Sequence, residues 1–250
     1  MLCFYLEPFR DFKGYYTYLQ RHDFHGRFKN APSYERFVEL MKGLLMPFFL
    51  MLHFFRGEET GKYYVDSTKL AVCHNKRIFK HKVFKDIAAR GKSSMGWFFG
   101  FKLHIVINDK KELMSFTITK GNVDDRKPLE YLTQHLKGII GGDKGYISAK
   151  LFKELYKRGL HLIVGIRKTM KNYLMPLADK LFLRKRNLVE TVIGQNKYTA
   201  LEHSRHRSVV NFFVHLLGCL VAYQLKTLIA NRLKSRINDK SNQNNMLQIA

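Results

Sequence analysis

The stretch Gly138-Ile139-Ile140-Gly141-Gly142-Asp143-Lys144-Gly145-Tyr146 decides the fold. Its apolar start predicts a short buried strand. The strand ends in two glycines, and the carboxylate of Asp143 follows them. Glycines let another group approach the backbone closely. Ser148 follows as a good cap for a helix. An aspartate on the turn after a buried strand lies where open α/β sheets usually place their chemistry.

The segments on either side of this strand predict a mixed sheet. Residues 63–68 are rich in strand formers, residues 97–108 alternate apolar and other side chains, and residues 112–119 form the expected hairpin partner. Helices are expected over 124–136 and 148–158, a strand over 160–166, and mostly helix from 182 to 233. Three strands of hairpin character followed by two crossovers indicate an α/β fold, a mixed five-stranded sheet flanked by helices on both faces.

The regions outside the sheet divide the chain into three parts. Residues 1–60 predict a small N-terminal helical region, with Ser33 capping a helix through Met46 and Pro47 starting or kinking the next. Residues 61–233 form the expected α/β domain. Residues 234–250 carry several Asn and Gln side chains and predict a disordered tail.

Charge points to a polyanionic partner. Lysine plus arginine number 44 against 20 acidic residues, which gives a net charge of +24. Such an excess favours nucleic acid over an anionic membrane surface. The apolar runs Leu44–Phe55 and Val209–Tyr223 are shorter than the ~20 residues of a membrane span, so both are interpreted as buried helices.

The remaining bulk features indicate a soluble protein in a reducing, cytoplasmic setting. No secretory signal is visible at the start of the sequence. The three cysteines, Cys3, Cys73 and Cys219, are scattered and odd in number, so they predict no disulfide framework and are expected to be buried.

Three acidic residues stand out by position. Asp66 lies on the first predicted strand, Asp143 ends the central one, and Glu190 lies in the helix after the last one. Arg186 and Lys197 share a helical face with Glu190. A pair of magnesium ions needs hard oxygen ligands from rigid elements, and such a pair clamps the oxygens of an in-line phosphoryl displacement. Spacing alone leaves open a solvent-facing Asp66 and a surface ion pair at Glu190.

Six motifs in order resemble those of the DDE transposases of bacterial insertion sequences, and most closely the insertion sequence 982 family. The resemblance runs from about Pro32 to about Tyr223. The motifs are Tyr64-Val65-Asp66-Ser67-Thr68, Ala71-Val72-Cys73-His74-Asn75, Gly96-Trp97-Phe98-Phe99-Gly100-Phe101-Lys102-Leu103-His104, Gly121-Asn122-Val123-Asp124-Asp125, Gly142-Asp143-Lys144-Gly145-Tyr146 and His203-Ser204-Arg205-His206-Arg207-Ser208.

The resemblance implies an RNase H-like fold and a metal-binding catalytic triad of Asp66, Asp143 and Glu190. It implies Mg²⁺ as the cofactor, with Mn²⁺ accepted, and no small-molecule cofactor. It also implies hydrolytic nicking at the ends of a mobile element, followed by attack of the freed 3′-hydroxyl on target DNA. The partners would be double-stranded DNA and further copies of the chain assembled on it. Leu183 stands where many relatives carry a tyrosine, and the sequence before the shared part is shorter than usual.

Basic residues around the triad are expected to contact DNA phosphates. Those predicted to do so are Lys144, Arg186, Lys197, His203, Arg205 and Arg207. The basic loop 76–92 is expected to engage DNA as well, whereas Trp97 is expected in the core. Asp124 or Asp125 is expected to cap the helix over 124–136, with membership of the acidic site as the other reading.

Two alternatives to a transposase stay open. One is a metal-dependent nuclease on the same fold, which cleaves strands without joining them. The other is a truncated, inactive remnant that only binds nucleic acid, whose binding would be unchanged when Asp66 or Asp143 becomes Ala.

Overall fold

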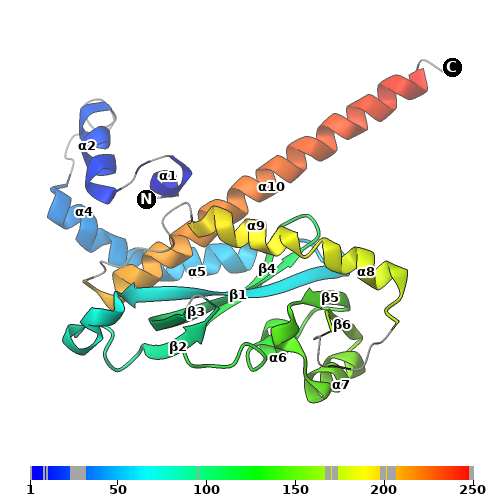
Figure 1. Ribbon diagram of the computed structural model, residues 1–250. Coiled ribbons are helices and arrows are strands. Elements are labelled where there is room, and N and C mark those ends of the chain that lie inside the picture. Colours follow the sequence, from blue (N-terminus) through cyan, green and yellow to red (C-terminus); the bar gives the residue numbers. More distant parts are fainter. Residues whose placement is uncertain are drawn as a thin grey trace.

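A computed structural model gives the fold of the 250-residue chain (Figure 1). It describes residues 2–7, 9, 11–22, 32–94, 96–166, 170, 174–197, 201 and 207–247, with side chains through residue 239. His203 and Arg205, both expected to contact DNA, lie outside the described residues.

One mixed sheet forms the centre of the molecule. Its strands are β1 (Lys62–Cys73), β2 (Ala89–Ser93), β3 (Gly96–Asn108), β4 (Leu113–Lys120), β5 (Gly138–Gly142) and β6 (Leu160–Val164). The order is β2-β3-β1-β5-β6, with β4 also paired to β3. β1, β2 and β4 run antiparallel to β3, whereas β1, β5 and β6 are mutually parallel. The predicted mixed sheet flanked by helices is confirmed.

The short strand β2 was not predicted. It pairs with the first part of β3, from Ser93↔Gly96 to Ala89↔Gly100, and β4 pairs with the rest of β3 from Phe101 onward. The two strands therefore share one edge of β3, and six strands occupy five positions. The sequence of β2, Ala-Arg-Gly-Lys-Ser, lacks the apolar alternation that marks a half-buried strand.

Helices surround the sheet. They are α1 (Leu2–Leu6), α2 (Phe12–His22), α4 (Tyr34–Leu40), α5 (Leu45–Phe54), α6 (Leu129–Leu132), α7 (Ala149–Lys157), α8 (Leu177–Arg184), α9 (Asn187–Asn196) and α10 (Val209–Leu247). Three short 3₁₀ turns accompany them, η1 (Met41–Leu44), η2 (Asn75–Lys80) and η3 (Lys144–Tyr146).

Alternation along the strands produces two cores. Tyr64 and Ile105 belong to a cluster that includes α5, α8, α9 and α10. Their neighbours Tyr63, Val65 and Val106 belong to a second cluster that includes α6 and α7. Because successive side chains of a strand point to opposite faces, the two clusters lie on the two faces of the sheet. Figure 1 shows α8, α9 and α10 together on one side and α6 and α7 on the other.

The helix expected over 124–136 is mostly absent. Only α6, of four residues, forms there, and Pro128 occupies its N-cap position without a side-chain cap. Asp124 instead accepts hydrogen bonds from the backbone N–H and the guanidinium of Arg126. These local bonds hold the backbone in a turn, since a short acidic side chain competes with helix formation in this way. Neither Asp124 nor Asp125 caps a helix.

The two apolar runs differ in burial. Most of α10 between residues 212 and 222 is buried, as predicted. α5 is not, because only Phe48 and Leu52 are buried, while Phe49 and Phe54 are 52% and 75% exposed. By length and composition, residues Tyr34–Phe54 and Val209–Asp239 both form helices apolar enough to cross a membrane. Only one side of α5 contacts α10, which explains its exposure.

Three further expectations differ from the structure. Residues 234–247 continue helix α10 where a disordered tail was predicted. No glycine or proline follows Gly218 to end this helix. Trp97 is 58% exposed and lies beside the ammonium of Lys92, so it is not a core residue. Cys3 is exposed, whereas Cys73 and Cys219 are buried and free as expected.

Candidate active site

Asp66 lies on the central strand β1. Tyr64, two residues earlier, packs on the face covered by α8 and α9, so the side chain of Asp66 points to that same face. The side chain of Asp66 is only 22% exposed to solvent. The backbone N–H of Ser67 donates a hydrogen bond of 2.8 Å to its Oδ1 atom. The predicted strand therefore delivers a mostly buried carboxylate beneath α9.

Asp143 follows the neighbouring parallel strand β5. Tyr64 pairs with Gly141, so Asp66 and Asp143 each stand two residues beyond the last paired positions of adjacent strands. Adjacent strands lie about 4.8 Å apart, which brings the two carboxylates to the same edge. Asp143 is exposed and occupies the N-cap position of η3.

The glycines before Asp143 have a packing reason. A Cβ atom at Gly141 would lie 3.1 Å from the rings of both Tyr64 and Phe182, and one at Gly142 would lie 3.1 Å from Tyr146. The sequence suggested that these glycines admit another group to the backbone. That group is the protein's own aromatic side chains.

Glu190 reaches the same place from α9. Val189, Val192 and Ile193 bury one side of this helix in the core, and α9 packs against β1. The guanidinium of Arg186 donates to Glu190 Oε1 at 2.6 Å and lies 3.8 Å from Asp66 Oδ2. Arg186 therefore bridges the strand carboxylate and the helix carboxylate.

The pKa of Asp66 depends on its burial and on the charges of the other two acids. This pKa is raised to about 6, chiefly by burial, and the charges of Asp143 and Glu190 contribute to the rise. The hydrogen bond from Ser67 and the charge of Arg186 oppose that rise. All three acids of the predicted triad therefore act electrostatically at one point, although they lie on three different elements.

Carboxylate oxygens are the ligands that Mg²⁺ and Mn²⁺ prefer, and like charges gathered around a buried carboxylate favour a cation. The donor set thus fits a divalent metal. As arranged in the described part of the chain, however, no three His, Cys, Asp or Glu side chains lie close enough to form a metal cluster. Arg186 supplies the positive charge between Asp66 and Glu190 instead.

The structure also describes three other residues that are predicted to contact DNA, Lys144, Lys197 and Arg207. Lys144 is exposed directly after Asp143, and its side chain runs beside Gly165 at the end of β6. Lys197 ends α9, two helical turns beyond Glu190. Arg207 is exposed just before α10.

Sequence reasoning gave no role to Tyr146 and only an alternative role to Asp125. Burial raises the pKa of Tyr146, as do the charges of Asp66, Asp125 and Asp143, so its hydroxyl lies close to the site. Asp125 Oδ1 in turn accepts a hydrogen bond of 2.9 Å from Lys102 and lies 3.9 Å from the ring of His104. Both residues belong to motifs quoted above, but motif membership does not reveal burial.

Comparisons with known proteins bear on the fold and on the family of the chain. No curated protein matches the chain significantly. Among solved structures, the piggyBac transposase in a synaptic complex with hairpin DNA is similar, with a TM-score of 0.51 at 10% sequence identity. The likeness covers 88% of this chain and 56% of that one, so the chain spans little more than half the length of that relative, and the likeness concerns the fold.

A family model decides the assignment. The model of the transposase DDE domain matches residues 56–209, more than half of the chain. Asp66, Asp143 and Glu190 all lie inside the matched region. The chain belongs to the transposase DDE domain family.

Proposed function

We propose that this protein cleaves DNA strands at the ends of an insertion sequence and transfers them to target DNA, with Asp66, Asp143 and Glu190 as its catalytic carboxylates. The observation that carries the proposal is that Asp143 after β5 and Glu190 of α9 both lie close enough to the mostly buried Asp66 of β1 for their charges to act on it. Membership of the insertion sequence 982 family is part of the proposal and rests on the six motifs.

Each residue has a separate role in this proposal. The three carboxylates would hold Mg²⁺ or Mn²⁺, which supplies Lewis-acid stabilisation of phosphate oxygens and activates the attacking oxygen. Arg186 forms ion pairs with both Asp66 and Glu190, and its guanidinium is also suited to a DNA phosphate. Lys144 and Lys197 flank the carboxylates as further phosphate contacts.

The partners follow from charge and fold. A net charge of +24 suits double-stranded DNA at both the element ends and the target. The similar piggyBac structure is a synaptic complex with hairpin DNA. For this protein we propose an assembly of several copies of the chain on DNA. We place it with chromosomal DNA in the cytoplasm.

Labelled duplexes that carry candidate element ends test the proposal. We expect the wild type to nick them in Mg²⁺ or Mn²⁺, and Asp143→Asn to lose nicking while still binding DNA. Asp239→Asn makes the same chemical change on the exposed end of α10 and should behave as the wild type. Nicking without strand-joining products would identify a nuclease instead.

One observation favours the second candidate, an inactive DNA-binding protein. Arg186 fills the space between Asp66 and Glu190 as a salt bridge, and the described residues form no metal cluster. If the folded wild type binds duplexes but never cuts them in either metal, this candidate replaces the catalytic one.

A further inference from the structure

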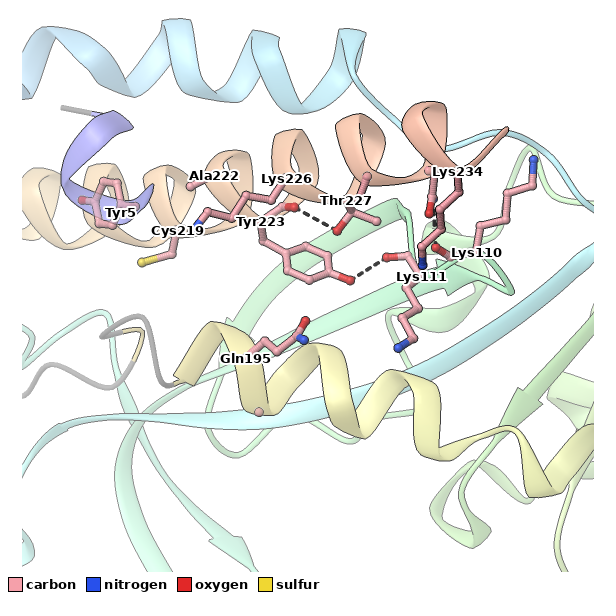
Figure 2. A pocket seen from close by; sticks show the side chains of 13 residues that line it. Tyr5, Lys110, Lys111, Gln195, Cys219, Ala222, Tyr223, Lys226, Thr227 and Lys234 are labelled. Atoms are coloured by element: carbon pink, nitrogen blue, oxygen red, sulfur yellow. Dashed lines mark hydrogen bonds between the residues drawn. The ribbon is translucent and has the colours of Figure 1, made fainter. Parts of the chain in front are cut away.

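A cavity of about 630 Å³ opens between α9, α10 and the turn that joins β3 to β4 (Figure 2). Tyr223 of α10 and Gln195 of α9 lie on its two sides, and Lys110 and Lys111 of the turn close one end. Lys226 and Lys234 of α10 also line it. The cavity does not include any of the three catalytic carboxylates.

Positive charge dominates this cavity. Four of its lining residues are lysines and none is acidic. Lys110 is paired with Glu58 at 2.7 Å, and Lys226 donates one hydrogen bond of 2.9 Å to the carbonyl of Leu6. Lys111 and Lys234 form no ion pair with any residue that the structure describes. Among the described residues, three of the four ammonium groups therefore have no acid as ion-pair partner, and Lys110 alone has one.

The turn that carries two of these lysines is fixed in place. The hydroxyl of Tyr223 donates to the carbonyl of Lys111 at 2.7 Å, and the amide of Asn231 donates to the carbonyl of Lys110 at 3.1 Å. Lys111 has a φ of +66°, an arrangement that costs an ordinary side chain roughly 1 kcal/mol and that tends to occur at functional sites. The structure thus holds a strained lysine rigidly at the mouth of the cavity.

The cavity lies close to the candidate active site. Gly194 of α9 lines it, and Glu190 stands four residues earlier on the same helix. Residues four apart share a helical face and are separated by about 6 Å along the axis. A strand bound at the carboxylates therefore needs to extend by about one helical turn along α9 to reach the wall of this cavity.

We propose that this lysine cavity binds backbone phosphates of the DNA strand held at the active site. Lys226 and Lys234 are eight residues apart, about 12 Å along α10. That distance corresponds to about three nucleotides at 3.4 Å each, which suits an extended polyanion better than a single small anion. The inference rests on the proposed function, since it places this DNA next to Glu190.

The variant Lys111→Asn/Lys234→Gln tests the cavity in the full-length chain. Asparagine tolerates positive φ, so the turn and its hydrogen bond to Tyr223 are retained. Lys153→Gln/Lys157→Gln removes the same charge from exposed positions on α7, across the sheet, and is the matched control. Dissociation constants for labelled duplexes of two unrelated sequences are measured against salt concentration in EDTA, so that no cleavage occurs.

We expect the cavity variant to lower the slope of log Kd against log salt by about 2, since each phosphate contact contributes about 0.9. At about 0.1 M salt this corresponds to a loss of roughly 60-fold, equal for both sequences. The α7 control should keep the slope of the wild type. An unchanged slope in the cavity variant would overturn the inference, even where the wild type cleaves and joins DNA. If the cavity variant lowers the slope as expected but the wild type never cuts DNA, the proposed function is overturned and the cavity inference stands.

Acetylation of lysine amines in the wild type tests the cavity independently and needs no variant. Bound duplex should protect Lys111 and Lys234 from acetylation and leave Lys153 reactive. Protection of the cavity lysines by polyglutamate but not by duplex would refute DNA as the ligand.

Discussion

Replacing Asp66 by Asn should make the protein more stable at neutral pH. The pKa of Asp66 is raised to about 6 from the ordinary value of 3.8, chiefly by burial. The folded state therefore binds this proton more tightly than the unfolded chain. The stabilising contribution of the protonated carboxyl is complete below about pH 4 and is lost as pH rises through about 6. Above that pH the buried charge is a cost to the folded state.

The magnitude follows from the environment of the side chain. A rise of about two pKa units corresponds to about 3 kcal/mol. The pKa of about 6 already includes the attraction of Arg186, so the ion pair that asparagine gives up is not subtracted again. Asparagine keeps an oxygen to accept the hydrogen bond from Ser67. We therefore expect Asp66→Asn to raise the free energy of unfolding by about 1–3 kcal/mol at about pH 7.5, and to change it little at about pH 4.

Urea unfolding followed by far-UV circular dichroism, at several pH values and with EDTA present, measures this difference. Asp239→Asn, on the exposed end of α10, serves as the control and should change stability little at every pH. A destabilised Asp66→Asn variant at neutral pH, or a gain that is the same at pH 4 and 7.5, would refute the argument from burial.

Three other substitutions test the packing and charge around the site. Gly141→Ala should lower the free energy of unfolding by about 1–3 kcal/mol, because its Cβ atom would lie 3.1 Å from two buried rings; Gly145→Ala, with open space around it, should leave the thermal midpoint unchanged. Gln224→Ala should cost about 1–3 kcal/mol in urea unfolding, because it leaves a backbone N–H of β4 and the carbonyl after α5 unpaired. Arg186→Gln should raise the pKa of Asp66 further, as an NMR titration of the carboxyl would show; an unchanged pKa would mean that the 3.8 Å ion pair does not form in solution.

The sequence predicted those elements whose signals are local. The alternation in β3 places Leu103, Ile105 and Ile107 on one face, and these residues lie in the core formed with α9 and α10. Ser148 caps α7 through a hydrogen bond to the backbone N–H of Leu151, as its type suggested. The acids of the triad could be assigned to a strand, a turn and a helix because each follows or interrupts a strong apolar pattern.

The remaining features depend on partners that are distant in sequence. β2 forms because β3 offers it an edge, and its own residues give no signal. α5 is apolar on all sides, so its composition could not reveal which side α10 covers. The burial of Tyr146 and the contact of Asp125 with Lys102 likewise arise only when loops after β4 and β5 meet.

Deleting residues 1–60 tests whether the predicted helical region is a separate unit. Tyr5 donates a hydrogen bond to His215 or accepts one from it at 3.0 Å, and Phe48 and Leu52 of α5 share a core cluster with α10. Without these partners, the apolar face of α10 that carries Leu217 would be exposed over several turns, which favours aggregation. We expect chain 61–250 to be aggregated or to lose cooperative thermal unfolding, measured by light scattering and calorimetry. A monomeric truncated chain with an unchanged midpoint would contradict this expectation, because the sheet would then owe none of its stability to residues 1–60.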